Sequence, residues 1–198
     1  MPNISFLQML AHSDDSESSA VLAQAHRRLA KIARERGTME QARIHIERAL
    51  TLDEARGDQA GMIADYEFLG VLLLTLGLLD DAEHAIRKVF DLDPHLNQGI
   101  TAATACANLG LILKRRGNLR CAQKLFLRSL RLAQRLERED IVSTQYANLA
   151  SLYWKLGKFN RAGILLQSAA HTFRKLRMEE SLAAATYLLQ VLKARDKS

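Results

Sequence analysis

Two asparagines, Asn108 and Asn148, stand forty residues apart, and basic side chains follow each of them. An asparagine amide offers both a hydrogen-bond donor and an acceptor, as a backbone peptide group does. The nearby cations Lys114, Arg115 and Lys155 can form charge-assisted hydrogen bonds with carboxylates. These residue types could hold an acidic peptide. Asparagine is also tolerated on an exposed helix face, however, and basic residues also serve solubility.

Sequence patterns of common catalytic sites do not occur in the chain. It contains no G-x-G-x-x-G, Walker-type loop, G-x-S-x-G or H-E-x-x-H sequence. Its six histidines are scattered, so we expect none to pair with another at metal-ligand spacing. Cys106 and Cys121 match no zinc pattern, and we expect them to be buried or semi-buried thiols too far apart for a disulfide. The sequence predicts no enzyme, no cofactor and no metal site.

Helices must position these residues, because the composition and a repeated pattern both favour helix. The chain is 48% hydrophobic and contains only two prolines. A forty-residue pattern recurs four times without an insertion. Its glycines are Gly37, Gly77, Gly117 and Gly157, and the alanines five residues later are Ala42, Ala82, Ala122 and Ala162. The leucines eight residues before the glycines are Leu29, Leu69, Leu109 and Leu149, and the small residues after them are Ala30, Gly70, Gly110 and Ala150. The large apolar residues nine positions after the glycines are Ile46, Ile86, Phe126 and Leu166.

Each copy is predicted to be a helical hairpin, because a glycine between two amphipathic runs supplies the positive φ that ends one helix. The small residues should lie where the two helices cross. The predicted first helices are 17–36, 59–76, 97–116 and 139–156, the second helices 39–55, 79–92, 119–136 and 159–176, and a ninth helix 179–195. We expect Thr38 to cap a helix in a capping box with Gln41, Asn118 and Asn160 to cap later helices, and Pro94 to end one.

The spacing of Gly, Ala and Pro in LGLLDDAEHAIRKVFDLDP (76–94) resembles the tetratricopeptide repeat, whose usual period is 34 residues. The longer period here, with ANLG (107–110) and YANLASLYWKLGKFNRA (146–162), is similar to the subclass of kinesin light chains and bacterial regulators. The resemblance implies an all-α, right-handed α-solenoid of four repeats with a C-terminal capping helix. The predicted organisation is a flexible segment 1–16 and a single domain 17–198, with repeats 17–57, 58–96, 97–137 and 138–178.

The resemblance also implies that the first helix of each hairpin lines a concave groove, and that asparagine in it binds the backbone of an extended peptide. Asn108 and Asn148 occupy that position, whereas Arg28 and Phe68 replace it in the first two copies. The predicted peptide-binding residues are Arg28, Lys31, Phe68, Asn108, Leu111, Lys114, Arg115, Asn148, Trp154 and Lys155. Trp154 could anchor a partner or simply pack between helices.

The formal net charge of +6 is unevenly distributed, because residues 61–100 carry −5 and residues 101–140 carry +6. A basic stripe, Arg120, Lys124, Arg128, Arg131, Arg135 and Arg138, should face outward. It could follow a phosphate backbone or an anionic membrane. The chain shows no aromatic residues interleaved with these cations and no helix-turn-helix or zinc module, which argues against nucleic acid.

The expected function is a non-catalytic scaffold that binds a peptide or protein segment, with an acidic ligand favoured. The alternative is a homo-oligomeric or nucleic-acid-associated regulator that uses the basic stripe. Apolar residues of the final helix suggest either self-association there or a chain that continues in a longer homologue; they are Leu182, Leu188, Leu189, Val191 and Leu192. Without a signal peptide or a run of 18 apolar residues, the sequence predicts a cytoplasmic protein that does not insert into membranes.

Overall fold

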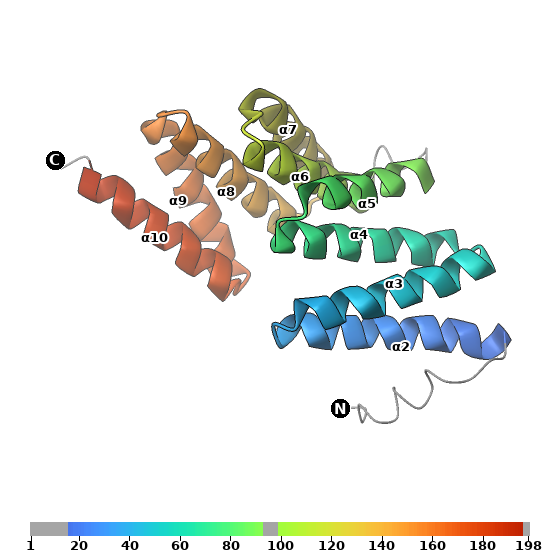
Figure 1. The fold of residues 1–198 in the computed structure, drawn as a ribbon. Coiled ribbons are helices and arrows are strands. Elements are labelled where there is room, and N and C mark those ends of the chain that lie inside the picture. Colours follow the sequence, from blue (N-terminus) through green and yellow to red (C-terminus); the bar gives the residue numbers. More distant parts are fainter. Residues whose placement is uncertain (1–15, 93–98, 196–198) are drawn as a thin grey trace. The chain divides into compact units, whose positions relative to one another are not determined.

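The computed structural model describes residues 16–92 and 99–195, and the regular secondary structure in these ranges is entirely α-helical (Figure 1). The first unit holds α2 (Ser16–Glu35), α3 (Met39–Arg56), α4 (Gln59–Leu76) and α5 (Leu79–Leu92). The second unit holds α6 (Ile100–Arg115), α7 (Leu119–Arg135), α8 (Glu139–Lys155), α9 (Phe159–Lys175) and α10 (Glu179–Arg195). The all-α class and the four helical hairpins predicted from the sequence are confirmed.

Contacts between helices group the chain into two compact units, residues 1–94 and 95–198. The division falls close to the predicted boundary between the second and third repeats. Each unit contains two hairpins, and the second unit also contains α10. The prediction of a single domain stays a prediction, and the units are described separately below. The predicted flexible segment lies outside the described residues except for Ser16, which begins α2.

The repeated small residues lie where the helices of each hairpin cross, as predicted. Ala30, Gly70, Gly110 and Ala150 are all buried. A Cβ atom added to Gly110 would lie 2.6 Å from Phe126 Cε1, and one added to Gly70 would lie 2.6 Å from Ile86 Cγ1. The four large apolar residues of the pattern, Ile46, Ile86, Phe126 and Leu166, are at most 2% exposed. The side chain opposite each small residue therefore fills the space that the small residue leaves.

Turns within the hairpins use glycine for its backbone conformation rather than for its size. Gly117 has φ of +82°, and apart from its two chain neighbours no residue has an atom within 4 Å of where its Cβ would be. A side chain would have room there but would be strained by the positive φ. Between hairpins, Glu137 (φ 52°) and Arg177 (φ 56°) adopt this conformation without glycine.

Of the three predicted caps, Thr38 and Asn118 occupy N-cap positions, but only Asn118 makes a capping hydrogen bond with its side chain. Asn118 Oδ1 accepts a hydrogen bond from the Cys121 backbone N–H at 3.3 Å. Thr38 precedes α3 but makes no side-chain cap, because its hydroxyl instead donates to Ala33 O at 3.0 Å. Asn160 lies inside α9, whose N-cap position is Lys158. The Thr38–Gln41 capping box and the Asn160 cap were therefore wrong, and Pro94 lies outside the described residues.

Helix α4 is long and apolar enough to span a membrane by length and composition alone, and it is the one such helix in the described ranges. Seven of its residues are buried, among them Leu72, Leu73 and Asp65. Asp65 forms an ion pair with Arg27 of α2. Packing inside the first unit therefore buries part of the apolar surface of α4.

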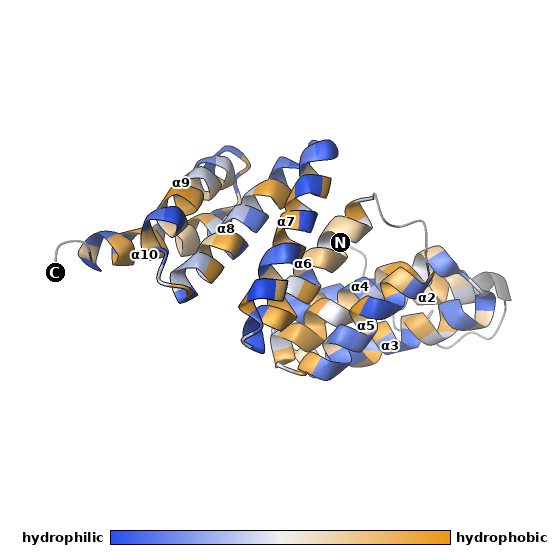
Figure 2. Cartoon of the chain, turned by 90° about the horizontal axis from the view of Figure 1, so that it is seen from above, coloured by the Kyte–Doolittle hydropathy of each residue, from blue (hydrophilic) through white to orange (hydrophobic). Residues whose placement is uncertain are grey.

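Helix α10 packs on α9 through much of its apolar side (Figure 2). Ala185 and Leu192 are buried in the cluster that α9 supplies, and Leu182, Leu188 and Leu189 pack against it. Tyr187 remains 66% exposed. Self-association through α10 stays a prediction, and Tyr187 is the apolar residue of this helix left most open for it.

Both cysteines are free, as predicted. Cys106 is buried in α6, where burial raises the pKa of its thiol. Cys121 is exposed at the start of α7, so the expectation that both thiols are buried or semi-buried was wrong for this residue.

Candidate ligand-binding surface

The predicted groove residues of the first unit lie on α2 and α4. Arg28 and Lys31 are exposed on α2. Phe68 is half-buried against Ala33, Ala42 and Leu72, and the Arg34 guanidinium lies 4.8 Å from its ring centroid. Packing and a cation–π contact therefore occupy part of the Phe68 ring, while the two cations remain open to solvent.

In the second unit, the predicted cations on α6 and α8 come together. Lys114 Nζ of α6 donates to Ser151 Oγ of α8 at 3.2 Å, and the lysine is half-buried. Burial lowers the pKa of the Lys114 amine, and the charges of Lys155 and Arg115 lower it further. Three predicted cations thus act on one another at this surface, and a bound anion would relieve their repulsion.

The two asparagines at the same repeat position are both half-buried, on α6 and α8. Asn148 Nδ2 donates to Gln145 Oε1 at 3.2 Å, which leaves the carbonyl of its amide open. Asn108 makes no side-chain hydrogen bond within the described part of the chain. Leu111 is half-buried and packs against the cluster of Ala122, Phe126, Leu149 and Leu152. We call Asn108, Lys114, Arg115, Asn148, Ser151 and Lys155 the α6–α8 surface.

Trp154 is not part of the α6–α8 surface and instead packs where α8, α9 and α10 meet. Its ring makes an edge-to-face contact with Phe159, with centroids 5.7 Å apart. Arg195 of α10 lies over the Phe159 ring, 3.3 Å from its centroid. The tryptophan is half-buried and packs against the cluster of α9 and α10. The packing interpretation of Trp154 accounts for these contacts, and its role as a partner anchor stays a prediction.

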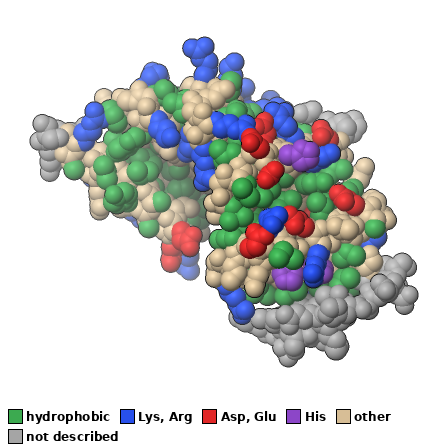
Figure 3. Space-filling view, in the orientation of Figure 1, with side chains coloured by type: hydrophobic (Ala, Val, Ile, Leu, Met, Phe, Trp, Pro, Cys, Tyr) green, Lys and Arg blue, Asp and Glu red, His purple; other side chains and the backbone are tan. Residues whose placement is uncertain are grey.

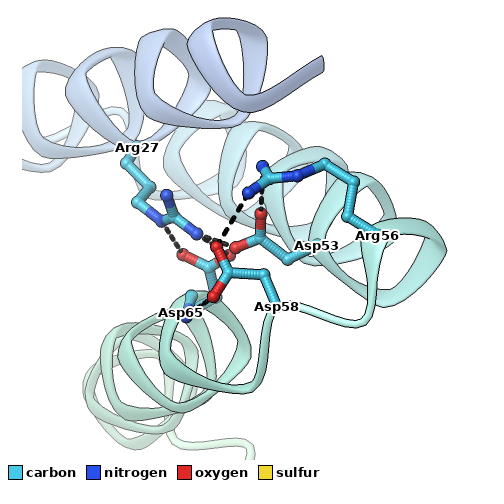
Figure 4. Close-up of polar contacts among 6 residues, drawn as sticks. Arg27, Asp53, Arg56, Asp58 and Asp65 are labelled. Atoms are coloured by element: carbon cyan, nitrogen blue, oxygen red, sulfur yellow. Dashed lines mark hydrogen bonds and ion pairs between the residues drawn. The ribbon is translucent and has the colours of Figure 1, made fainter. Parts of the chain in front are cut away.

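A buried charge cluster in the first unit was not predicted from the sequence (Figure 4). Arg27 of α2 donates to both carboxylate oxygens of Asp65 on α4, from Nε at 2.6 Å and from Nη2 at 3.2 Å. Its Nη2 also contacts Asp53 Oδ2 of α3. Arg56 of α3 bridges Asp53 Oδ1 at 3.1 Å and Asp58 Oδ2 at 2.9 Å. Two guanidinium groups therefore hold three carboxylates where α2, α3 and α4 meet.

This cluster needs Gly61, a glycine in the first turn of α4. Asp58 Oδ1 accepts the Gly61 backbone N–H at 3.0 Å, and a Cβ on Gly61 would lie 2.0 Å from Asp53 Oδ2. The side chains of Asp53 and Asp65 are 0% exposed, whereas that of Arg27 is 23% exposed. The carboxylates depend on their arginine partners, because buried charges without partners are costly.

The free energy of unfolding should depend on pH in the acid range because of the titration of Asp65. Burial raises its pKa from 3.8 to about 6, although Arg27 opposes the shift. Because the folded state binds this proton more tightly, the contribution of Asp65 is fully present below about pH 3.8 and is lost as the pH rises through about 6. The free energy of unfolding should fall by up to about 3 kcal/mol across this window relative to Asp65→Asn. Urea unfolding at several pH values checks this. If the free energy of unfolding changed equally with pH in wild type and Asp65→Asn, the prediction would be contradicted.

A histidine pair also departs from the expectation that no two histidines meet. His26 Nδ1 of α2 and His45 Nδ1 of α3 lie 3.1 Å apart, and His26 is buried. Burial and Arg48 lower the pKa of His45. No group of three or more His, Cys, Asp or Glu side chains in the described ranges is placed to hold a metal ion.

Comparison with known proteins finds a matching repeat family and solved structures with a similar fold. Residues 66–96 and 146–170 match the family model described as Tetratricopeptide repeat. No curated protein matches the chain. The crystal structure of BtubC (BKLC) from P. vanneervenii is 18% identical, with a TM-score of 0.68 over 98% of this chain and 88% of that one. A signal transduction ATPase with numerous domains and a tetratricopeptide repeat sensor, from Pyrococcus horikoshii, is 16% identical, with a TM-score of 0.76 over 96% of this chain and 29% of that one. MamA is 18% identical, with a TM-score of 0.54 over 88% of each chain.

Proposed function

Because the chain is a tetratricopeptide-repeat protein, we propose that it is a non-catalytic scaffold that binds a peptide or protein segment. The repeat family supports protein interaction as the general activity. The P. horikoshii protein, in which such repeats form a sensor, is an example of this use in a larger chain. Neither comparison identifies the ligand of this chain.

The α6–α8 surface is our candidate for the ligand site. Its cations and amides come from two neighbouring hairpins, and the Lys114–Ser151 hydrogen bond joins them. A ligand lying across both helices could contact Asn108 and Asn148 through its backbone, because each amide can serve a peptide group. The position of these groups on helices, rather than on loops, keeps the site organised before binding.

The ligand we propose is acidic. The observation that carries this proposal is the half-buried Lys114 amine, whose pKa is lowered by burial and by Lys155 and Arg115. A carboxylate beside Lys114 would favour the charged form of its amine and offset the repulsion among the three cations.

The cytoplasmic location and the absence of membrane insertion stay predictions, as does self-association.

Selection from a random peptide library displayed on phage tests both parts of this proposal. Selected peptides should be rich in Asp and Glu, and Asn108→Ala with Asn148→Ala should weaken their binding about 10-fold or more, because two hydrogen bonds are lost. Lys114→Met with Lys155→Met should weaken acidic peptides more than neutral ones. Fluorescence anisotropy of single peptides gives these affinities.

A matched control uses residues of the same types on another surface. Asn160 and Lys158 are exposed at the start of α9, so Asn160→Ala with Lys158→Met should leave peptide affinity unchanged. Peptides that bind wild type and all three double variants equally would exclude the α6–α8 surface as the site. Selected peptides without an excess of acidic residues would exclude only the acidic character of the ligand.

A further inference from the structure

Helix α7 presents five basic side chains to solvent on one face. Arg120, Lys124, Arg128, Arg131 and Arg135 are all exposed. At 100° per residue they fall within an arc of about 80° and span about 22 Å along the helix. The opposite side of α7 is buried and includes Ala122, Phe126 and Ala133. We call these five residues the α7 stripe.

One predicted member of the stripe does not belong to it. Arg138 lies beyond the end of α7, at the N-cap position of α8, and its Nε and Nη2 bond both oxygens of Asp140 at 2.9 and 2.6 Å. By contrast, Arg120, Lys124, Arg131 and Arg135 form no ion pair with any described residue. Helix α7 contains no acidic residue at all.

The forty-residue repeat supplies an internal comparison for the stripe. At the same five positions, α3 has Glu40, Ile44, Arg48, Thr51 and Ala55. The first four positions on α5 are Asp80, His84, Lys88 and Asp91, and the five on α9 are Asn160, Ile164, Ser168, His171 and Lys175. The repeat architecture therefore tolerates acidic, polar and apolar residues here. On the face drawn in Figure 3, blue basic side chains outnumber red acidic ones over the second unit, whereas both signs mix over the first.

Folding does not account for five cations on one face. Like charges at i and i+4, such as Arg120 with Lys124 and Arg131 with Arg135, repel one another on a helix. Arg120 also lies in the first turn, where the helix dipole disfavours positive charge, whereas Arg135 in the last turn is favoured by it. The stripe thus weakens α7 without a packing gain, which is typical of residues kept for binding.

We propose that the α7 stripe binds the phosphate backbone of double-stranded nucleic acid without sequence preference. Four of its five cations are arginines, whose planar guanidinium matches phosphate oxygens. Its linear array fits a regular row of phosphates better than a single anion. No aromatic residue stands among the cations to stack on unpaired bases, which favours a duplex. None of the large apolar side chains of α7 itself is exposed, as insertion into a membrane surface would require.

Titration of a mixed-sequence DNA duplex of about 20 base pairs tests this proposal, with binding followed by fluorescence anisotropy at increasing salt. With four to five phosphate contacts, log K should fall against log salt with a slope of about −4, a loss of more than about 100-fold between about 50 and 200 mM. Arg120, Lys124, Arg131 and Arg135 changed together to Gln should reduce the slope to about −1. Because this variant removes like-charge repulsion, its thermal midpoint should be no lower than that of wild type.

A charge-matched control separates the stripe from net charge. Arg48, Lys158, Arg174 and Lys193 are exposed and scattered over other parts of the chain, and changing all four to Gln should preserve most of the duplex affinity. Equal losses in both quadruple variants, or no duplex binding by wild type at low salt, would overturn the proposal. Binding to vesicles containing phosphatidylserine but not to DNA would assign the stripe to membranes instead. If the stripe variant does not fold, Arg120→Gln with Arg131→Gln should still reduce the slope by about 2.

Discussion

Replacing Arg27 by methionine should lower the free energy of unfolding of the first unit by about 3–5 kcal/mol, the usual cost of breaking a buried ion pair from one side. Arg27 donates twice to Asp65 and also contacts Asp53, and the side chains of both acids are fully buried. Methionine keeps an unbranched apolar stem but leaves Asp65 without its cation. The loss should be smaller below about pH 6, because Asp65 then becomes protonated.

The two units offer separate optical signals for this measurement. Trp154 is the only tryptophan and lies in the second unit, so its fluorescence follows that unit, whereas far-ultraviolet circular dichroism follows both. Urea unfolding of Arg27→Met should show part of the dichroism lost early while the tryptophan signal moves less. Arg28→Met, at the exposed neighbouring position, should change stability by no more than about 0.5 kcal/mol. Similar effects of the two substitutions would show that the charge cluster contributes little.

Replacing Phe126 by alanine should cost the second unit about 3–5 kcal/mol, because a fully buried aromatic ring leaves a cavity. Phe126 is 0% exposed and packs with Ala122, Leu149 and Leu152. Tryptophan fluorescence during urea unfolding reports this loss directly, because Trp154 belongs to the same unit. Leu127→Ala, at a half-buried position of the same helix, should cost less.

A second substitution tests why Phe126 needs a glycine opposite it. The Cβ of Gly110→Ala would lie 2.6 Å from the Phe126 ring, so this substitution alone should destabilise the unit by about 1–3 kcal/mol through overpacking. In the Phe126→Ala background the ring is gone, and Gly110→Ala should become neutral or stabilising, since alanine favours helix over glycine. Additive losses in the double variant would contradict direct packing between the two positions.

The sequence predicted the hairpins well because each repeated residue type has one local cause. The glycine turns, the small residues at the helix crossings and the large residue facing each crossing follow from backbone sterics and volume. The predicted Asn160 cap was wrong because it did not follow the register of the repeat. In register, the residue directly after the turn glycine precedes the helix, and in the fourth copy that residue is Lys158 rather than Asn160.

The charge cluster escaped sequence reasoning because its members are distant in the chain and lack a shared period. Arg27, Asp53 and Asp65 come from three helices and meet only when these pack. A signal was nevertheless present: the residues forty positions after Asp65 and eighty after Asp53 are Ala105 and Ala133, both buried. Because Ala25 and Ala105 stand at the position of Asp65 in the neighbouring copies, a charged residue there indicates a partner across the junction between hairpins, although the fourth copy has the polar Gln145.

The same cluster limits how freely these repeats could be exchanged during evolution. A hairpin that carries Asp65 and Gly61 needs a preceding hairpin that supplies Arg27, Asp53 and Arg56. At the equivalent junction of the second unit, Ala107 and Ala133 stand where Arg27 and Asp53 stand in the first. In a chimera that placed the third hairpin directly before the second, Ala107 would stand in place of Arg27, and Asp65 would be buried without a cation. The four copies look interchangeable in their spacing, but the first two form a matched pair that must be inherited together.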